Sequence, residues 1–295
     1  MQLSDRWMLV KLARRYGFII AADEVYHLLD WSSSLSTSKR KRGKNQRPAR
    51  FAVLDHVLSN DECLDATLTM SKKASDKNQQ QQLSTQGCAV SINSFTKIFS
   101  PGLRCGWIEG PVSIIDSIVN LGYIHSQGGC VPFTGNILWT ALTSGIQDRY
   151  LDKLIMSYRT RSQMLCDTLE TENGIRIHKK PEGGYFCWVE FTNIESVEDF
   201  ANYCQDGGLT IMSGLICDAM LDDDEGNYNT VEQQSHQSRE LCKHSARLCF
   251  AYMDKADIVD AAKLLIKLYR EYIGGLLFEK NKSHVKRSLL RRRKK

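Results

Sequence analysis

The hydrophobic pattern opens with a helix and a strand. Leu3–Tyr16 carries apolar residues at the spacing of an amphipathic helix, has basic residues near its end and runs into Gly17. The short apolar run Phe18–Ala22 comes next, and its continuous composition favours a strand buried on both faces. This order of helix, loop and buried strand is half of a βαβ unit, with the preceding strand missing.

The rest of the pattern alternates between helical and extended segments. A second strand-like run, Cys88–Asn93, is rich in apolar and β-branched residues. Further along the chain, Lys180–Val189 has the proline and glycine pattern of a turn leading into a strand. Helices are predicted over 111–123, 132–142, 148–172 (ending near Asn173-Gly174), 197–205 and 256–273 (ended by Gly274-Gly275), with a strand and turn over 208–214.

Residues 32–87 interrupt this pattern. They contain the serine run Ser32–Ser34, a basic cluster from Lys39 to Arg50 and the glutamine run Gln79–Gln82. Such composition is typical of a low-complexity insertion that forms a surface loop. The apolar content of Phe51–Val57 leaves a second interpretation open, in which part of the segment forms a local helix or binds a partner.

Composition narrows the class of protein. The 295 residues are 42% hydrophobic and 25% charged, as in soluble globular proteins. No apolar run reaches the ~18–20 residues of a membrane span, and the N-terminus lacks the apolar core of a signal peptide. We therefore expect no membrane association and a cytoplasmic location. A mitochondrial location would require a longer N-terminus.

The net charge of +5 is unevenly distributed. Residues 279–295 hold nine basic residues and one acid, so the rest of the chain is mildly acidic. A basic tail of this kind suits nucleic acid, anionic lipid or an import receptor, but a solvated, disordered tail without a partner explains it equally well. Nucleic-acid binding is not expected of the acidic body.

The cysteines indicate a reducing compartment and no metal site. Ten are scattered along the chain, none forms a C-x-x-C pair, and many lie within apolar runs, as small core residues do. They are Cys63, Cys88, Cys105, Cys130, Cys166, Cys187, Cys204, Cys217, Cys242 and Cys249.

The strongest chemical signal comes directly after the strand-like run at Cys88–Asn93. Lys97 ends the run Ser94-Phe95-Thr96-Lys97, and Arg104 lies seven residues further on. A lysine flanked by hydroxyl residues at a strand end, with an arginine at this distance, suits a pyridoxal-phosphate enzyme. The lysine would form the Schiff base, while Ser94 and Arg104 would hold the phosphate dianion.

The full run S-F-T-K-x-x-x-P-G-L-R-x-G-W resembles the class I/II aminotransferases, which are fold-type I pyridoxal-phosphate enzymes. The resemblance implies an α/β fold. A large domain with a mostly parallel sheet would be only partly present, followed by an α+β C-terminal small domain. It also implies pyridoxal 5′-phosphate as cofactor and Lys97 as the catalytic residue.

Three further stretches match the family in order. In Asp23-Glu24-Val25-Tyr26, the resemblance assigns Asp23 to the cofactor's pyridinium nitrogen and Tyr26 to its ring oxygen. Gly183-Gly184 matches a glycine pair beside the substrate, and Arg247 matches the arginine that grips the substrate α-carboxylate. Taken singly, each match has an ordinary structural explanation. Asp23 could cap a turn, Tyr26 could be a half-buried aromatic residue, the glycine pair could form a β-turn, and Arg247 could form a salt bridge.

The resemblance also implies a division of the chain. We expect a partial cofactor-binding domain over 1–147 that includes the insertion 32–87. A linking helix with a small C-terminal domain would occupy 148–278, and a disordered basic tail 279–295. The family's glycine-rich loop and N-P-T-G motif have no counterpart here. We therefore expect an N-terminally truncated member, with weak cofactor affinity if the chain exists as written.

The sequence thus predicts a pyridoxal-phosphate-dependent aminotransferase acting on an amino acid and a 2-oxo acid. The P-G-L-R-x-G-W variant resembles the aromatic and 2-aminoadipate branch. Alternatives are a lyase or synthase that uses the same lysine, and a truncated, inactive paralogue with an interaction role. Enzymes of this family are usually homodimers, so we expect a homodimer at full length.

Overall fold

The computed structural model describes residues 1–32, 49–60, 87–126, 128–129, 131–217 and 239–292. The chain divides into two compact units, Met1–Ile155 and Met156–Lys295. The division falls inside the long helix α7 (Ile146–Leu169), a few residues after the expected boundary at 147/148.

A three-stranded sheet organises the first unit, in the order β1 (Ile20–Asp23), β2 (Ala89–Ser94) and β3 (Gly106–Glu109). β1 and β2 are parallel, whereas β2 and β3 are antiparallel. β1 is not buried on both faces as predicted, because Ile20 is buried while Ala21 and Asp23 are exposed. The described helices that pack on this strand cover one face of it.

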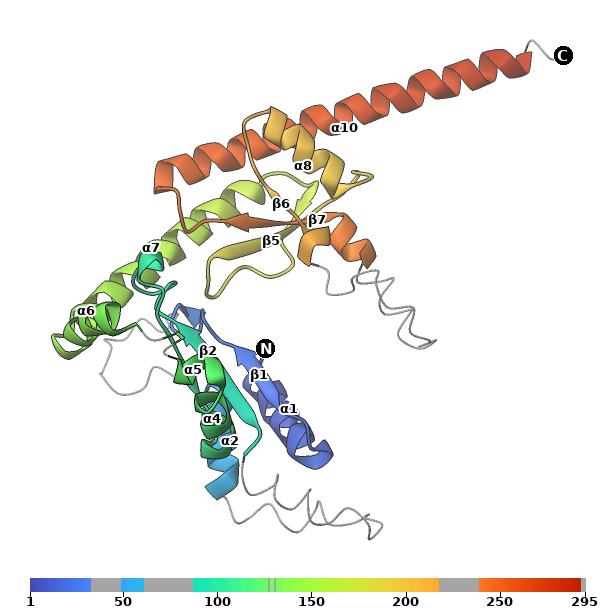
Figure 1. Cartoon of the computed structure of the whole chain (residues 1–295). Coiled ribbons are helices and arrows are strands. Elements are labelled where there is room, and N and C mark those ends of the chain that lie inside the picture. Colours follow the sequence, from blue (N-terminus) through green and yellow to red (C-terminus); the bar gives the residue numbers. More distant parts are fainter. Residues whose placement is uncertain (33–48, 61–86, 127, 130, 218–238, 293–295) are drawn as a thin grey trace, which may run out of the picture. The chain divides into compact units, whose positions relative to one another are not determined.

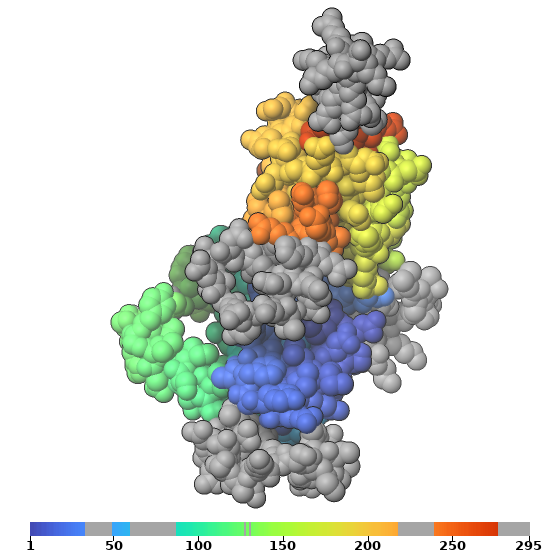
Figure 2. Space-filling model, turned by 90° about the vertical axis from the view of Figure 1, so that its right-hand side faces the viewer, coloured from blue at the N-terminus to red at the C-terminus, as the bar shows by residue number. Residues whose placement is uncertain are grey.

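Those helices are α1 (Leu3–Tyr16) and α2 (Phe51–Asn60), both labelled in Figure 1. Val10 and Ala13 of α1 share a buried cluster with Phe51, Leu54 and Leu58 of α2 and with the starts of β1 and β2. α1 ends at Gly17, whose φ of 75° is the left-handed conformation that favours glycine. In Figure 2 the blue surface is the N-terminal segment, so α1 also forms part of the exterior of this unit.

α2 corrects the prediction of a low-complexity insertion over 32–87. Parallel strands need a crossover connection, usually a helix, and α2 is the helix between β1 and β2. The alternative of a local helix is therefore confirmed for Phe51–Asn60, which packs on the sheet. The basic cluster as far as residue 48 and the glutamine run lie outside the described residues.

The first unit continues through short helical segments. The single helix expected over 111–123 is two, α4 (Val112–Val119) and α5 (Gly122–His125), and α6 (Pro132–Thr143) carries proline at its first position as expected. The 3₁₀ turn η3 (Pro101–Leu103) precedes β3. Gln147 of α7 donates to the carbonyl oxygen of Ile98 at 3.0 Å, which fixes the start of α7 against the loop after β2.

The second unit is built on an antiparallel sheet in the order β4-β5-β7-β6. Its strands are β4 (Ile175–Arg176), β5 (Phe186–Phe191), β6 (Met212–Ser213) and β7 (Ser245–Cys249), and its further helical segments are α8 (Val197–Asp206), η4 (Gly214–Cys217) and α10 (Lys255–Arg292). Phe191, Phe200 and Tyr269 join strand and helices in one aromatic cluster, with ring centroids 4.9–6.0 Å apart.

α10 runs further than the sequence predicted. A stop at Gly274-Gly275 is wrong, since the helix continues through both glycines to Arg292. Neither glycine has the positive φ of a helix-ending glycine, and a Cβ at either position would meet open space. The stretch from 279, expected to be a disordered tail, is helical as far as Arg292. None of the described helices is long and apolar enough to cross a membrane.

Candidate functional site

The candidate site of the first unit lies where β1 and β2 end. Because the strands are parallel, their carboxyl ends meet at one edge of the sheet, where ligands bind in α/β folds. Asp23 pairs in register with Ile92, and Ser94 lies two residues beyond, so the side chains of Asp23 and Ser94 share one face. That face is opposite the one covered by α2.

Lys97 and Tyr26 meet at this edge from two different loops. Lys97 lies in a turn held by the amides of Phe99 and Ser100, which both donate to the carbonyl oxygen of Phe95. Its Nζ lies 5.6 Å from the centroid of the Tyr26 ring, in the turn after β1. Both side chains are half-buried, so a polar ligand can reach them.

Ser94 and Arg104 are joined by the backbone of the loop between them. The Ser94 hydroxyl donates to the carbonyl oxygen of Cys105 at 3.4 Å and accepts from the amide of Thr96 at 3.1 Å. Arg104 is exposed, has a left-handed φ of 47°, and forms no ion pair within the described part of the chain. A serine hydroxyl and an arginine guanidinium are groups that can bind a phosphate dianion.

Among the described residues, the carboxylate of Asp23 has one weak hydrogen bond. Its Oδ1 accepts a long hydrogen bond of 3.4 Å from the amide of Val25, which is weak support for the turn-capping interpretation. Because the side chain is exposed, the carboxylate can also bind a protonated ring nitrogen. The structure therefore brings Asp23, Tyr26, Ser94, Lys97 and Arg104 together on the strand-end loops of one sheet.

Sequence reasoning missed Glu24, which anchors this edge. Its buried carboxylate accepts from Arg6 at 2.6 Å, from the hydroxyl of Ser91 at 2.6 Å and from the amide of Phe51 at 3.1 Å. The last contact caps the start of α2 and joins it to the end of β1. Alternation along a strand could have suggested this role, because adjacent acids point to opposite faces and one must then be buried.

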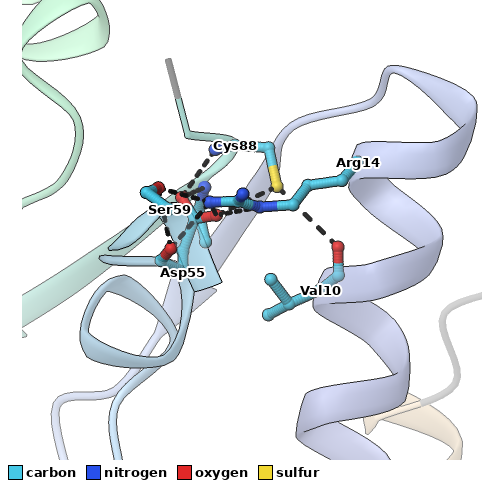
Figure 3. Close-up of polar contacts among 6 residues, drawn as sticks. Val10, Arg14, Asp55, Ser59 and Cys88 are labelled. Carbon is cyan, nitrogen blue, oxygen red and sulfur yellow. Dashed lines mark hydrogen bonds and ion pairs between the residues drawn. The ribbon is translucent and has the colours of Figure 1, made fainter. Parts of the chain in front are cut away.

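A second buried acid, Asp55, fixes the start of β2 (Figure 3). Its Oδ1 accepts two hydrogen bonds from Arg14 at 2.6 and 2.8 Å, and its Oδ2 accepts from the amides of Cys88 and Ala89 at 2.6 and 2.9 Å. Burial and the nearby Asp55 carboxylate raise the pKa of the Cys88 thiol to about 12. No sequence signal pointed to this contact, because its partners come from three distant segments.

The second unit holds Arg247 on β7, directly across from Trp188 and Met212 of the neighbouring strands. Its guanidinium carbon lies 4.2 Å from the centroid of the Phe186 ring, and its Nη2 donates to the sulfur of Met212 at 2.8 Å. No carboxylate pairs with Arg247 within the described residues. A half-buried arginine with an aromatic and a thioether neighbour is well suited to bind an anion.

The predicted glycine pair leads into the strand beside Arg247. Gly184 has a left-handed φ of 76°, which glycine adopts without strain, and β5 begins two residues later at Phe186. The turn thus leads into the strand residue Phe186, whose ring packs on the guanidinium of Arg247. Across the described residues, no three histidine, cysteine, aspartate or glutamate side chains converge as metal ligands.

Comparison with known proteins shows which protein family the chain belongs to. The family model "Aminotransferase class I and II" matches residues 4–265, so the chain belongs to that family. An aromatic amino acid aminotransferase of Schizosaccharomyces pombe is 27% identical over 201 residues, covering 64% of this chain and 36% of that protein. An uncharacterized HTH-type transcriptional regulator of Bacillus subtilis is 26% identical over 143 residues, covering 48% and 29%.

Solved structures show the same fold. The aromatic aminotransferase Aro9 of Candida albicans superposes with a TM-score of 0.64 at 18% identity, over 94% of this chain and 53% of that one. This chain therefore spans about half the length of that structure. The fold-type I architecture predicted from the motif is confirmed.

Proposed function

We propose that this protein binds pyridoxal phosphate at the strand-end site and transfers amino groups. The observation that carries the proposal is the meeting of Lys97 and Tyr26 at the carboxyl edge of a parallel strand pair. A primary amine, a carboxylate on the same edge and a serine–arginine pair form the donor set that the cofactor's aldehyde, ring nitrogen and phosphate require.

Each residue has a distinct role in the proposed mechanism. Ser94 and Arg104 would bind the phosphate, and the negative charge of Asp23 would keep the ring nitrogen protonated. When bound, pyridoxal phosphate supplies a ring that accepts the electron pair left on the substrate α-carbon. Lys97 would hold the cofactor through its side-chain amine, and the same amine would carry the proton removed from the substrate α-carbon.

Arg247 is the proposed substrate anchor. Its guanidinium binds the α-carboxylate shared by amino acids and 2-oxo acids, because planar donors suit a carboxylate. We propose aromatic or 2-aminoadipate substrates, supported by the aromatic aminotransferases among the relatives and neighbours. A lyase or synthase would need the same lysine and arginine, so these reactions are distinguished by identifying their products.

We also propose self-association. Several large apolar side chains on α4–α6 are exposed, among them Val112, Tyr123, Phe133 and Trp139. The cost of hydrating them favours contact with a second copy of the chain. Sedimentation of the purified chain over a range of concentrations tests this, and a monomer at every concentration contradicts it.

A second candidate function has specific support. The similarity to a transcriptional regulator shows that sequences of this kind also occur in proteins named for regulation. A chain in that role would use the same fold as a binding module without turnover. The proposed transaminase must therefore be tested by product as well as by cofactor binding.

The test begins with borohydride trapping. After incubation with pyridoxal phosphate and reduction, the wild-type chain should carry the cofactor mass on the peptide that contains Lys97. Lys97→Ala should lose it, while Lys153→Ala, an exposed lysine of the same unit, should keep it. Formation of a 2-oxo acid from phenylalanine with 2-oxoglutarate as acceptor then separates transaminase from lyase. Trapping without any product supports the binding module.

A further inference from the structure

The guanidinium of Arg247 is held by weak partners. One face stacks on Phe186, and Nη2 donates to the sulfur of Met212, which is a poor hydrogen-bond acceptor. Since no carboxylate competes for it within the described residues, this donor is available to an anion. It is equally available to any stronger acceptor that arises at the sulfur itself.

The side chain of Met212 is partly exposed. Met212 is 38% exposed and lies on β6, an edge strand that pairs with β7 alone in the sheet. Other exposed methionines include Met156 on α7, at 67%. Within the described part of the chain, Met212 is the methionine whose sulfur accepts a hydrogen bond from a charged side chain.

We propose that Met212 is an oxidation site that controls carboxylate binding at Arg247. The inference rests on the proposed role of Arg247 as the carboxylate anchor. In the step, a sulfur lone pair attacks one oxygen of hydrogen peroxide and the O–O bond breaks. Sulfur loses two electrons and becomes the sulfoxide, while the other oxygen leaves as water after proton transfer. The oxidant is a peroxide, which must come from outside the protein.

Oxidation replaces a weak acceptor by a strong one at the same place. Methionine sulfoxide is polar, and its oxygen carries partial negative charge that attracts the guanidinium N–H groups. A substrate carboxylate then loses a donor at Nη2 and meets a like partial charge beside it. Because the lost contact is a charge-assisted hydrogen bond, carboxylate affinity should fall roughly tenfold or more.

The experiment measures binding of 3-phenylpropionate, a carboxylate without an amino group, to the purified chain by calorimetry. Peroxide treatment is followed by dithiothreitol, which reduces disulfides and sulfenic acids but leaves sulfoxide. We expect about 16 Da on the Met212 peptide, roughly tenfold weaker binding, and recovery after treatment with methionine sulfoxide reductases. Unchanged affinity with Met212 fully oxidised overturns the proposal.

Three variants sharpen the test. Met212→Leu keeps a similar volume without an oxidisable sulfur, so peroxide should leave its affinity unchanged. Met156→Leu removes the more exposed methionine, and its binding should remain peroxide-sensitive. Met212→Gln places a permanent amide acceptor at the guanidinium and should bind weakly without peroxide.

The outcomes separate this inference from the proposed function. If the untreated wild-type chain binds no 3-phenylpropionate, the anchor role of Arg247 fails, and this inference fails with it. If untreated binding is normal and Met156→Leu abolishes the peroxide effect, the anchor stands and Met212 is the wrong site. Should Met212→Leu lose basal binding, recovery by the reductases in Met156→Leu, where Met212 remains, still decides the question.

Discussion

Two buried acids hold the candidate cofactor site in place without belonging to it. Glu24 joins the end of β1 to the start of α2 and to Arg6, while Asp55 joins the middle of α2 to Arg14 and the start of β2. Each carboxylate is almost fully buried and accepts several hydrogen bonds, so its charge is compensated. The loops that carry Asp23 and Lys97 therefore follow strands that these hydrogen bonds join to α2.

Asp55→Asn should destabilise the protein by about 3 kcal/mol, because it removes the carboxylate charge that pairs with the half-buried Arg14 guanidinium. Urea unfolding followed by circular dichroism measures the loss. Asp116→Asn, at an exposed position of α4, should change the free energy of unfolding by less than about 0.5 kcal/mol. Equal effects of the two variants would show that the Arg14–Asp55 pair contributes nothing beyond a surface charge.

The raised pKa of Cys88, which contacts Asp55, predicts that the free energy of unfolding depends on pH. Its pKa is raised from 9.0 to about 12 in the folded protein, so above pH 9 the unfolded thiol ionises while the folded one stays neutral. The stability that depends on the neutral thiol is complete below pH 9 and is lost as the pH rises toward 12. The unfolding free-energy difference between wild type and Cys88→Ala should therefore shrink by about 1.4 kcal/mol from pH 8 to pH 10. A constant difference contradicts the raised pKa.

At the scale of elements, local signals were predictive where the partners are near in sequence. The helix ending at Gly17, the strand before Lys97 and the turn at Gly184 all carry their own glycine or apolar pattern. α2 could not be recognised as core, because Glu24, Arg14 and Ser91, which define its place, are far from it in the chain. The contacts of Arg247 with Phe186 and Met212 likewise required the register of three strands.

α10 shows where a local signal misleads, and it can be tested. If the helix passes through the glycine pair, Gly274→Ala/Gly275→Ala should strengthen it, by about 1 kcal/mol for each substitution, because alanine favours the helix. The negative circular dichroism band of helices at about 222 nm should become stronger. Gly17→Ala is the contrasting variant and should destabilise, since its φ of 75° strains a side chain. A loss of helical signal in the double variant would instead support a helix that ends at Gly274-Gly275.

At the scale of the whole molecule, the residues of the proposed chemistry are divided between two units. Lys97, Asp23, Tyr26, Ser94 and Arg104 belong to the first unit, and Arg247 with its aromatic and thioether neighbours belongs to the second. The division inside α7 means that one continuous helix contributes to both. Amino transfer requires cofactor and carboxylate binding together, whereas each binding event alone should require its own unit.

This division predicts separable losses. Lys97→Ala should abolish cofactor trapping and leave the affinity for 3-phenylpropionate within about twofold, because the two sets of contacts share no residue. Arg247→Ala should do the reverse. Both variants should lose 2-oxo acid formation, Lys97→Ala by at least about 100-fold because the proton carrier is gone. Circular dichroism spectra matching the wild type exclude misfolding as the cause. If a well-folded Arg247→Ala also loses cofactor trapping, then Arg247 acts on the cofactor itself, and the assignment of separate roles is wrong.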